Sequence, residues 1–364
     1  MAKLKYYVLT SKNLDCLKRH FSEKFSNLPK NNTVVVINTL DEEYIKIAGS
    51  YCEEHNIEYY VTDSNGTPAR GKNSVIDIFL NSDNEYMVQI DGDDYLTPHG
   101  VWMYNHLSLS DSPPDAVFLW RQKGWGTTFW KEEDDDECSV TIEKTDPFCL
   151  DYDALLESNI HDEYRKEAIK AGRPKTEIEK HIKNFERFWK FQQKYCEPLT
   201  QHCRLTFQSR KAAEIRFPEN ITVGEDTLHY YLLKNESKCG NLNVVRSSEY
   251  PPTYIYDQTQ TGTVVEYSAG GQDTSWIDEF LGNAYKYEQK GILHEGYELP
   301  DLTIDYPTGY QADECGYGAN SWYHELIAEG IKYSIYFPHN ASFSSVLDEM
   351  LRYREQENLN GNSI

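Results

Sequence analysis

The chain has 364 residues, and its 36 Lys or Arg against 59 Asp or Glu give a formal net charge of −23 at pH 7. Hydrophobic residues make up 39% and aromatic residues 13%, which is enough for a packed core and excludes a disordered acidic chain. The charge argues against binding a nucleic-acid polymer or an anionic membrane, because both need clusters of Lys and Arg. A phosphorylated ligand would therefore need a cation brought with it, most simply a divalent metal.

The sequence also favours a cytoplasmic location. The apolar run at residues 6–9 is too short for a signal peptide, and no apolar stretch approaches the ~18 residues of a membrane span. The eight Cys form neither a C-x-x-C pair nor a zinc spacing. We expect free thiols, no membrane span and no zinc site.

The first hundred residues alternate between two patterns. Apolar and β-branched runs predict strands at residues 6–10, 33–37, 57–61 and 86–90. Helical spacing predicts helices at residues 13–25, 41–54 and around 75–80. This alternation with short connections predicts right-handed βαβ units, and so an α/β fold with a mostly parallel sheet flanked by helices.

The rest of the chain is less regular. Residues 153–195 are helical and locally basic, and Pro174 is expected to divide them into two helices. The acidic run at 132–137 is expected to be a solvated loop. We further expect a strand and turn at 205–217, a helix from 225 to 232, an edge strand or ordered loop at 250–256, helices at 276–287 and 344–355, and a frayed end at 358–364.

Three carboxylates follow the fourth predicted strand at once, as Asp91, Asp93 and Asp94 around Gly92. In open α/β sheets, ligands bind beyond the carboxyl ends of the strands. Crowded carboxylates repel one another, and Mg²⁺ or Mn²⁺ removes that cost. The segment therefore indicates a metal site, although a plain acidic turn with a positive φ at Gly92 also accounts for it.

The loop at residues 62–73 leaves the third predicted strand. It is polar, contains Arg70 and Lys72, and leads into a helix whose N-terminus could bind phosphate. An ordinary connection between strand and helix is the other interpretation of this loop.

Taken together, these segments resemble the nucleotide-sugar-binding half of GT-A fold glycosyltransferases, particularly the large inverting family 2. Residues 38–41 match the polar turn after the second strand, residues 66–73 match the segment that contains A-R-x-x-N, and residues 91–94 match D-x-D-D. The resemblance covers roughly residues 4–110 and 203–262. It implies a GT-A domain at residues 1–265 with a helical acceptor-side insertion at about 150–200, and a C-terminal aromatic-rich extension at 266–364.

The resemblance also implies a donor, a UDP- or GDP-linked sugar. Asp91 would face the ribose or base, and Asp93 or Asp94 would bind the Mn²⁺ or Mg²⁺ that bridges the diphosphate. Arg70 or Lys72 would lie near the departing nucleoside diphosphate. The expected donor-binding residues are Thr10, Asn38, Asp41, Asp63, Arg70, Asn73 and Asp91.

A second matching segment includes Glu225 and Asp226, which resemble the family's E-D motif. By this resemblance Asp226 is the general base that deprotonates the hydroxyl of a glycan or other acceptor, with inversion at the sugar, and Glu225 is its neighbour. An acidic pair that suits the helix dipole is the other interpretation. Candidates for a third metal ligand by chemistry alone are His229, His294 and His339, for which a core or surface role is favoured.

Two other functions stay open. A nucleotidyltransferase that makes sugar nucleotides also places carboxylates beyond parallel strands, but its glycine- and arginine-rich loop is not seen at residues 10–13. A non-catalytic carbohydrate-binding protein could use the aromatic residues after 270, such as Trp276 and Tyr285, to stack on sugars. Packing is the commoner role of such residues.

Overall fold

The computed structural model describes residues 4–22, 26–96, 98–119, 124–127, 140–141, 160–195, 204–247, 253–257 and 275–304. The acidic run at 132–137, the helix expected at 344–355, the C-terminal end at 358–364 and His339 lie outside these residues. Within them, no helix has the length and apolar character needed to cross a membrane.

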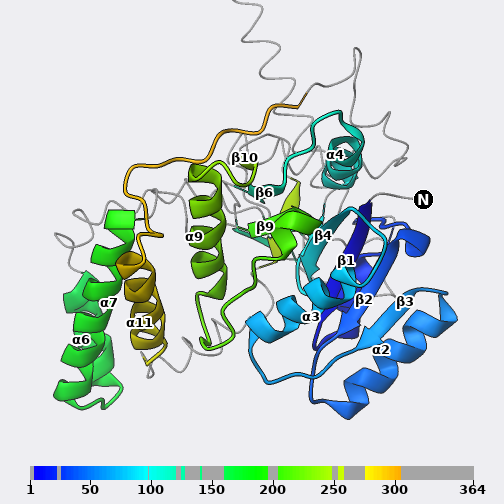
Figure 1. Ribbon diagram of the computed structural model, residues 1–364. Helices are drawn as coiled ribbons and strands as arrows, with labels where there is room; N and C mark the ends of the chain where they lie inside the picture. The colour runs from blue at the N-terminus through cyan, green and yellow to red at the C-terminus, as the bar shows by residue number, and fades with distance from the viewer. Residues whose placement is uncertain are drawn as a thin grey trace, which may run out of the picture.

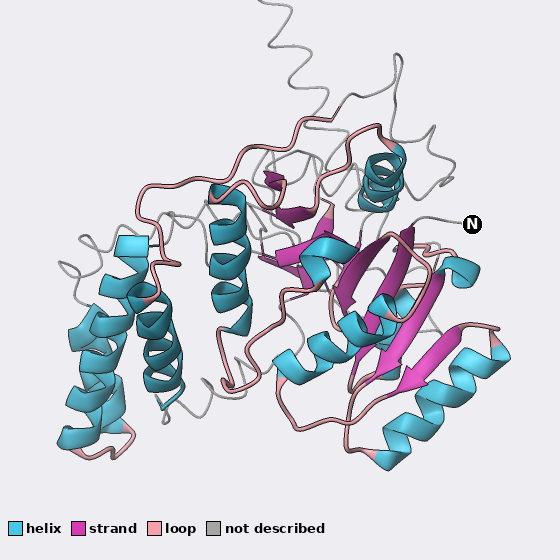
Figure 2. Ribbon diagram, viewed as in Figure 1, coloured by secondary structure: helices cyan, strands magenta, loops and turns pink. Residues whose placement is uncertain are grey.

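A seven-stranded sheet forms the centre of the described part (Figures 1 and 2). Its order is β10-β6-β9-β4-β1-β2-β3, and only β9 runs antiparallel to its neighbours among these described strands. The predicted α/β fold with a mostly parallel sheet is therefore confirmed. The strands are β1 Leu4–Thr10, β2 Thr33–Ile37, β3 Glu58–Val61, β4 Tyr86–Asp91, β6 Ala116–Leu119, β9 Arg204–Ser209 and β10 Val244–Ser247.

The register brings the carboxyl ends of four strands to one edge. Leu9 pairs with Asp91 between β1 and β4, and Ile37 of β2 pairs with both Thr10 and Val61. Every residue of β2 is buried, as its β-branched run predicts for a strand covered on both faces. The polar residues that follow these strands therefore meet along one rim of the sheet, where a ligand site was predicted.

Helices cover both faces of the sheet. They are α1 Leu14–Arg19, α2 Glu42–Glu54, α3 Pro68–Leu80, α4 Pro98–Leu109, α6 Ile160–Lys170, α7 Lys175–Tyr195, α8 Arg210–Ala213, α9 Glu225–Lys238 and α11 Ser275–Gln289, with a 3₁₀ turn η1 at Lys30–Asn32. Side chains alternate along β1, so that Tyr6 packs with Leu17 of α1 and Tyr104 of α4, whereas Tyr7 packs with Phe79 of α3. The core is thus divided between the two faces.

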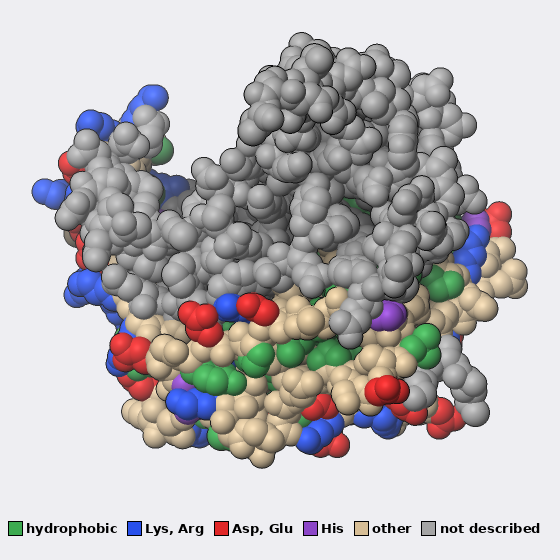
Figure 3. Space-filling view, turned by 90° about the horizontal axis from the view of Figure 1, so that it is seen from above, with side chains coloured by type: hydrophobic (Ala, Val, Ile, Leu, Met, Phe, Trp, Pro, Cys, Tyr) green, Lys and Arg blue, Asp and Glu red, His purple; other side chains and the backbone are tan. Residues whose placement is uncertain are grey.

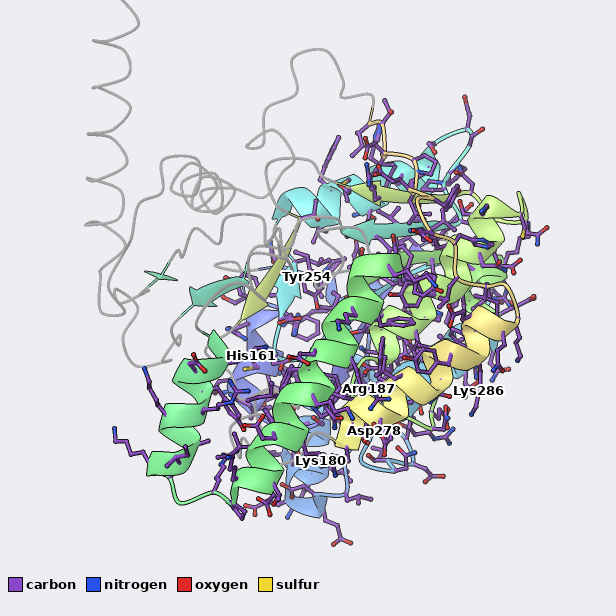
Figure 4. The ribbon with its side chains drawn as sticks, turned by 90° about the vertical axis from the view of Figure 1, so that its left-hand side faces the viewer. His161, Lys180, Arg187, Tyr254, Asp278 and Lys286 are labelled. Atoms are coloured by element: carbon purple, nitrogen blue, oxygen red, sulfur yellow. The ribbon has the colours of Figure 1, made fainter. Side chains whose placement is uncertain are left out.

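The helices α6, α7 and α11 lie beside α9, away from β1–β3 (Figure 1). Pro174 lies between α6 and α7, as expected. Phe191 of α7 and Phe280 of α11 pack edge to face, 5.8 Å apart between ring centroids. Arg187 and Asp278 join the same two helices at 2.8 Å (Figure 4). The helix α11 of the predicted C-terminal extension therefore shares the core of α9, whereas Leu302 and Ile304 pack with the core that contains Tyr6.

Several described elements were not predicted from the sequence, among them the helix α4 and the strands β6 and β10. The buried residues of α4, such as Met103 and Tyr104, lie on one side of the helix. Trp102 is only partly buried and Leu109 is exposed, so apolar residues occur on both sides and the sequence lacks the one-sided apolar pattern that identifies a surface helix. A smaller sheet contains β5 Tyr95–Leu96, β7 Gly124–Thr127, β8 Val140–Thr141 and β11 Tyr254–Asp257. The strand β11 confirms a strand within residues 250–256, but it lies between β5 and β7 and is not the expected edge strand.

Candidate functional site

The carboxyl ends of β1, β2 and β3 are tied together beyond their last residues. The backbone N–H of Asn38 donates to the Thr10 carbonyl oxygen at 2.9 Å. The Asn38 side-chain amide donates to the Thr62 hydroxyl at 2.7 Å and to the Asp63 carbonyl oxygen at 3.3 Å. The structure therefore brings three predicted donor-binding residues, Thr10, Asn38 and Asp63, to one polar rim.

Two members of the predicted donor set have local structural contacts. Asp41 is the N-cap of α2, and its side chain accepts hydrogen bonds from the N–H groups of Glu43 and Tyr44. The Thr10 hydroxyl is hydrogen-bonded to the buried Tyr44 hydroxyl. Asp41 therefore has a structural role as a helix cap, and the Tyr44 hydroxyl of α2 is bonded to the last residue of β1.

The acidic turn at residues 91–94 follows β4 directly. The Asp94 N–H donates to the Asp91 carbonyl oxygen at 3.1 Å and closes the turn. A Cβ on Gly92 would lie 2.6 Å from the Leu9 carbonyl oxygen, well inside van der Waals contact. Close approach of β1 therefore explains this glycine. The positive φ expected for a plain turn is not present at Gly92.

The C-terminal end of α1 supports the acidic turn by contacting carbonyl oxygens of the turn. Arg19 Nη2 donates to the Asp93 carbonyl oxygen at 2.8 Å, and His20 Nε2 lies 3.3 Å from the Gly92 carbonyl oxygen. Burial lowers the pKa of His20 to about 3. The ring is therefore neutral at neutral pH and can donate from Nε2 to that carbonyl.

The three carboxylates of the turn differ in exposure. Asp94 is fully buried, and its Oδ2 accepts a hydrogen bond of 2.7 Å from the Tyr254 hydroxyl of β11. The same hydroxyl oxygen lies 3.3 Å from the Asp91 N–H, which donates to it. Asp91 and Asp93 are only partly buried. Asp94 thus supports the turn, and Asp91 and Asp93 are the better candidates for contact with a ligand.

The oxygen ligands of this turn fit Mg²⁺ or Mn²⁺. Mg²⁺ is commonly held by one or two carboxylates together with substrate phosphates, and Asp91 and Asp93 can supply the carboxylates. Among the described residues, no group of three or more His, Cys, Asp or Glu forms a complete metal site. Of the candidate third ligands, His229 stacks on Phe217 with 3.8 Å between centroids, and His294 contacts the last turns of α9.

The loop after β3 leads into α3 with its polar groups ordered. Thr67 is the N-cap, and its hydroxyl accepts from the Arg70 N–H at 3.4 Å. Arg70 Nε donates to the Asp63 carbonyl oxygen at 3.4 Å, and Arg70 Nη1 lies 3.6 Å from the Glu219 carboxylate. Arg70 remains about one-third exposed at this rim, where a donor phosphate is predicted.

Asn73 contacts the segment that precedes α9. Its side-chain amide donates to the Phe217 carbonyl oxygen at 2.9 Å and to the Glu219 carboxylate at 2.8 Å. Its side-chain oxygen accepts from the Phe217 N–H at 3.0 Å. The Asn73 amide thus makes two reciprocal hydrogen bonds with the Phe217 backbone, and these contacts explain Asn73 as the link between α3 and the chain before α9. Its predicted donor contact has no support in them.

Lys72 makes the most informative contact of the site. Its Nζ lies 2.8 Å from Glu225 Oε1 and 2.5 Å from Asp226 Oδ1. The Lys72 and Glu225 side chains are 6% and 8% exposed, whereas Asp226 is 32% exposed. The structure therefore brings the two predicted catalytic carboxylates to α3, the helix that carries Arg70. Arg70 or Lys72 was expected near the diphosphate, and the contacts described for Lys72 are with the carboxylates of α9.

The start of α9 is shaped by Gly224. This N-cap residue has a φ of 88°, and a Cβ at this position would lie 2.7 Å from the Phe280 ring of α11. Only glycine adopts this backbone conformation without strain. The glycine therefore lets α11 pack against the helix start that presents Glu225 and Asp226.

Burial sets the protonation of this region. It raises the pKa of the Glu225 carboxyl, an effect opposed by Lys72 and increased by Asp226. Burial also lowers the pKa of His229 to about 4, so this ring is neutral at neutral pH. His229 Nε2 lies 2.8 Å from the Ile215 carbonyl oxygen, and it can donate to it. His229 is therefore a core residue, as favoured from the sequence.

Charged side chains are distributed unevenly over the described surface. Lys and Arg gather at the end of the molecule where α6 and α7 lie (Figure 3). Seven of these are exposed: Lys166, Lys170, Lys175, Lys180, Lys183, Lys190 and Lys194. This confirms that the basic segment at 153–195 is a local exception in an acidic chain.

Comparisons with known proteins give no family. No family model matches the chain, and no curated protein matches it. Among solved structures, S. aureus TarS is similar with a TM-score of 0.36 and 15% identity, over 76% of this chain and 41% of that chain. TarS 1–349 in complex with UDP-GlcNAc gives 0.36 and 14%, over 72% and 60%. The mannosyltransferase PcManGT from Pyrobaculum calidifontis, in complex with GDP-Man and Mn²⁺, gives 0.41 and 10%, over 91% and 73%. At these TM-scores the likenesses do not establish a function.

Proposed function

We propose that this protein is a metal-dependent GT-A glycosyltransferase of the inverting family 2 type. It would transfer a sugar, such as a hexose, from a UDP- or GDP-linked donor to a hydroxyl of a glycan or other acceptor. Mg²⁺ or Mn²⁺ would be the cofactor, and residues 1–265 would form the catalytic domain. The described residues that carry the proposal come from the strand ends, the acidic turn, α3 and the start of α9.

The contact of Lys72 with Asp226 is the observation that carries the proposal. The A-R-x-x-N segment and the E-D pair resemble, respectively, donor-side and acceptor-side elements of one active site. Their residues are 154 positions apart in sequence, yet Lys72 and Asp226 meet at 2.5 Å. A chance resemblance of two short motifs gives no reason for such a meeting, whereas sugar transfer requires donor and base to be adjacent.

On the donor side, the polar rim would hold the nucleoside diphosphate. Asn38 and Asp63 lie at the ends of β2 and β3, and Arg70 is placed to neutralise phosphate charge at the start of α3. Asp91 and Asp93 would hold the metal or the ribose at the end of β4. A divalent metal bound there supplies positive charge that stabilises the leaving diphosphate.

On the acceptor side, Asp226 is the more suitable base of the pair. Its side chain is 32% exposed and can reach an acceptor hydroxyl, whereas Glu225 is buried. Asp226 would take the hydroxyl proton as the oxygen forms a bond to the anomeric carbon. The bond from that carbon to the diphosphate breaks, and the nucleoside diphosphate leaves with its electron pair. A single displacement of this kind inverts the anomeric configuration.

The helices α6 and α7 would form the acceptor-side insertion. Helix α6 packs on α7, α7 on α11, and α11 on α9, whose first turn carries Asp226 (Figure 1). The exposed lysines of α6 and α7 would face an acceptor with negative groups (Figure 3). The described part of the C-terminal extension would support them through α11.

The test is incubation with a panel of nucleotide sugars, with Mg²⁺ or Mn²⁺ and with metal chelated. We expect metal-dependent release of a nucleoside diphosphate from one donor, and an inverted anomeric proton in the product by NMR. Asp93→Ala should abolish release, whereas Asp83→Asn, an exposed carboxylate at the opposite end of β4, should retain it. Formation of a sugar nucleotide from a nucleoside triphosphate would identify a nucleotidyltransferase. Sugar binding without turnover would identify a binding protein, and both results would contradict the proposal.

A further inference from the structure

We infer that Lys72 is a positioning residue of the general base: one ammonium shared by Glu225 and Asp226 keeps the Asp226 carboxylate oriented and ready for a proton. This inference rests on the proposed function and deepens it. It gives Lys72 a part on the acceptor side, where the resemblance places it only among possible phosphate contacts.

The geometry supports a shared cation. Lys72 Nζ reaches both carboxylates within 2.8 Å, and it also lies 5.4 Å from the Phe217 ring centroid. With 6% of its side chain exposed, Lys72 is covered by protein in a place where an unpaired ammonium would be costly. The ammonium is therefore held by its two carboxylate partners rather than extended into the solvent.

The number of carboxylates explains why the arrangement suits a base. With a single carboxylate partner, Lys72 would form a closed ion pair with Asp226 and make that carboxylate a poor proton acceptor. Glu225 supplies a second negative group, so Lys72 keeps a counterion when Asp226 becomes neutral. The proton taken from the acceptor then stays on Asp226, while Lys72 and Glu225 remain paired, and no charge is left alone in the interior.

The other charged groups near this cluster leave the argument unchanged. His229 of α9 is neutral at neutral pH, and Arg70 of α3 is near Glu219, which precedes α9. On α11, the Glu279 carboxylate accepts from Thr222. On the sheet beneath α3, Gln89 and Gln208 share the face of Met87 and are neutral. The charged residues of β1 and β4 on that face, Lys5 and Asp91, lie near opposite ends of the strands.

The experiment measures the acidic limb of the kcat/KM–pH profile in three variants. Lys72→Met removes the positive charge and should move the limb to higher pH by about one unit or more. Glu225→Gln removes a negative charge and should move it to lower pH. The double variant has the same formal charge as the wild-type cluster and should return the limb close to its original position. Lys72→Arg, which keeps the charge, should leave the limb in place at a lower rate.

A merely structural role would lower rates without these opposite shifts, and a phosphate-binding role for Lys72 would raise the donor KM alone. Either result would overturn the inference. If Lys72→Met does not fold, Glu225→Gln and Lys72→Arg still decide it. Carbon-13 NMR titration of the Asp226 carboxyl, assigned with Asp226→Asn, gives the same shifts without turnover. It therefore tests the inference even if no nucleotide sugar is a donor.

Discussion

Two acidic clusters of this molecule are built in different ways. The acidic turn at residues 91–94 is shaped mainly by contacts to its backbone, from Arg19, His20 and the Tyr254 hydroxyl, which also donates to the carboxylate of the buried Asp94. The pair at the start of α9 is instead held through its carboxylates, by Lys72. We interpret the first as a frame for a cation that arrives with a ligand, and the second as a carboxylate pair that carries its own cation and exchanges a proton.

The largest expected effect separates metal binding from proton transfer. Asp226→Asn removes the proposed base and should lower the transfer rate by about 10²- to 10⁴-fold at every metal concentration. Asp93→Asn should raise the metal concentration needed for half-maximal rate, by at least about tenfold, and recover in part when metal is added. Metal titrations of both variants check this. If added metal restored the rate of both variants, or of neither, the two clusters would not be separated into a metal-binding and a proton-transfer group.

The second prediction concerns the backbone at the start of α9. Gly224→Ala should destabilise the fold by roughly 2–4 kcal/mol, because it strains a positive φ and forces a Cβ against Phe280. Gly240→Ala is the matched control, since Gly240 has a φ of 73° and no heavy atom within 4 Å of an added Cβ. Urea unfolding of both variants separates the clash from the strain. Equal losses would mean that the contact with α11 is unimportant.

The third prediction compares the two neutral histidines, one behind each cluster. His20 and His229 have folded-state pKa values of about 3 and about 4, below the ordinary value of 6.5. At a pH between the folded-state pKa and 6.5, the unfolded chain binds protons that the folded protein does not. The free energy of unfolding contributed by each neutral ring is therefore complete above pH 6.5 and is lost as the pH falls towards the folded-state pKa. From His229 alone the loss by pH 4 is about 3 kcal/mol.

Urea unfolding at a series of pH values measures this loss. His229→Gln should reduce the slope of the free energy of unfolding against pH between pH 6.5 and about 4. His20→Gln should reduce that slope between pH 6.5 and about 3. An unchanged slope in both variants would show that neither ring is held neutral. A slope changed only in His229→Gln would restrict the effect to the acidic pair.

The smallest expected effect is at Tyr254. Tyr254→Phe removes the hydroxyl that donates to Asp94 and accepts from the Asp91 N–H, which should cost about 1–2 kcal/mol of stability. It should also weaken metal binding by about tenfold, because the turn loses its support. Isothermal titration with Mn²⁺ measures the second effect. Tyr59→Phe, which loses an exposed hydroxyl bond to Glu53, is the control and should change neither quantity.

The sequence predicted those parts of the sheet that depend on residues close together in the chain. Residues 33–37 form a continuous β-branched run, and β2 has these bounds. The buried core of α2 follows the helical spacing of Tyr44, Ala48 and Cys52. The reversed direction of β9 was not predicted, because it depends on which strands it joins. No pattern within residues 204–209 records that choice.

The site was predictable in its position but only partly in its contacts. The end of β4 was identified from residue types and the start of α9 from a resemblance, and the edge of the sheet collects the predicted side chains of β1, β2 and β3. The partner of Lys72 could not be read from the sequence, because α3 and α9 meet only after the sheet has formed. The same holds for Tyr254, whose hydroxyl joins β11 to the acidic turn.

The position of β9 has a consequence for synthesis of the chain. It fills the place between β4 and β6, although it lies far beyond both in the sequence. During translation, β1–β4 can assemble while the open side of β4 still lacks its partner, and an unpaired strand edge is a template for association between chains. We therefore expect nascent chains that end before residue 204 to associate through that edge, and chains that extend past residue 209 to be protected.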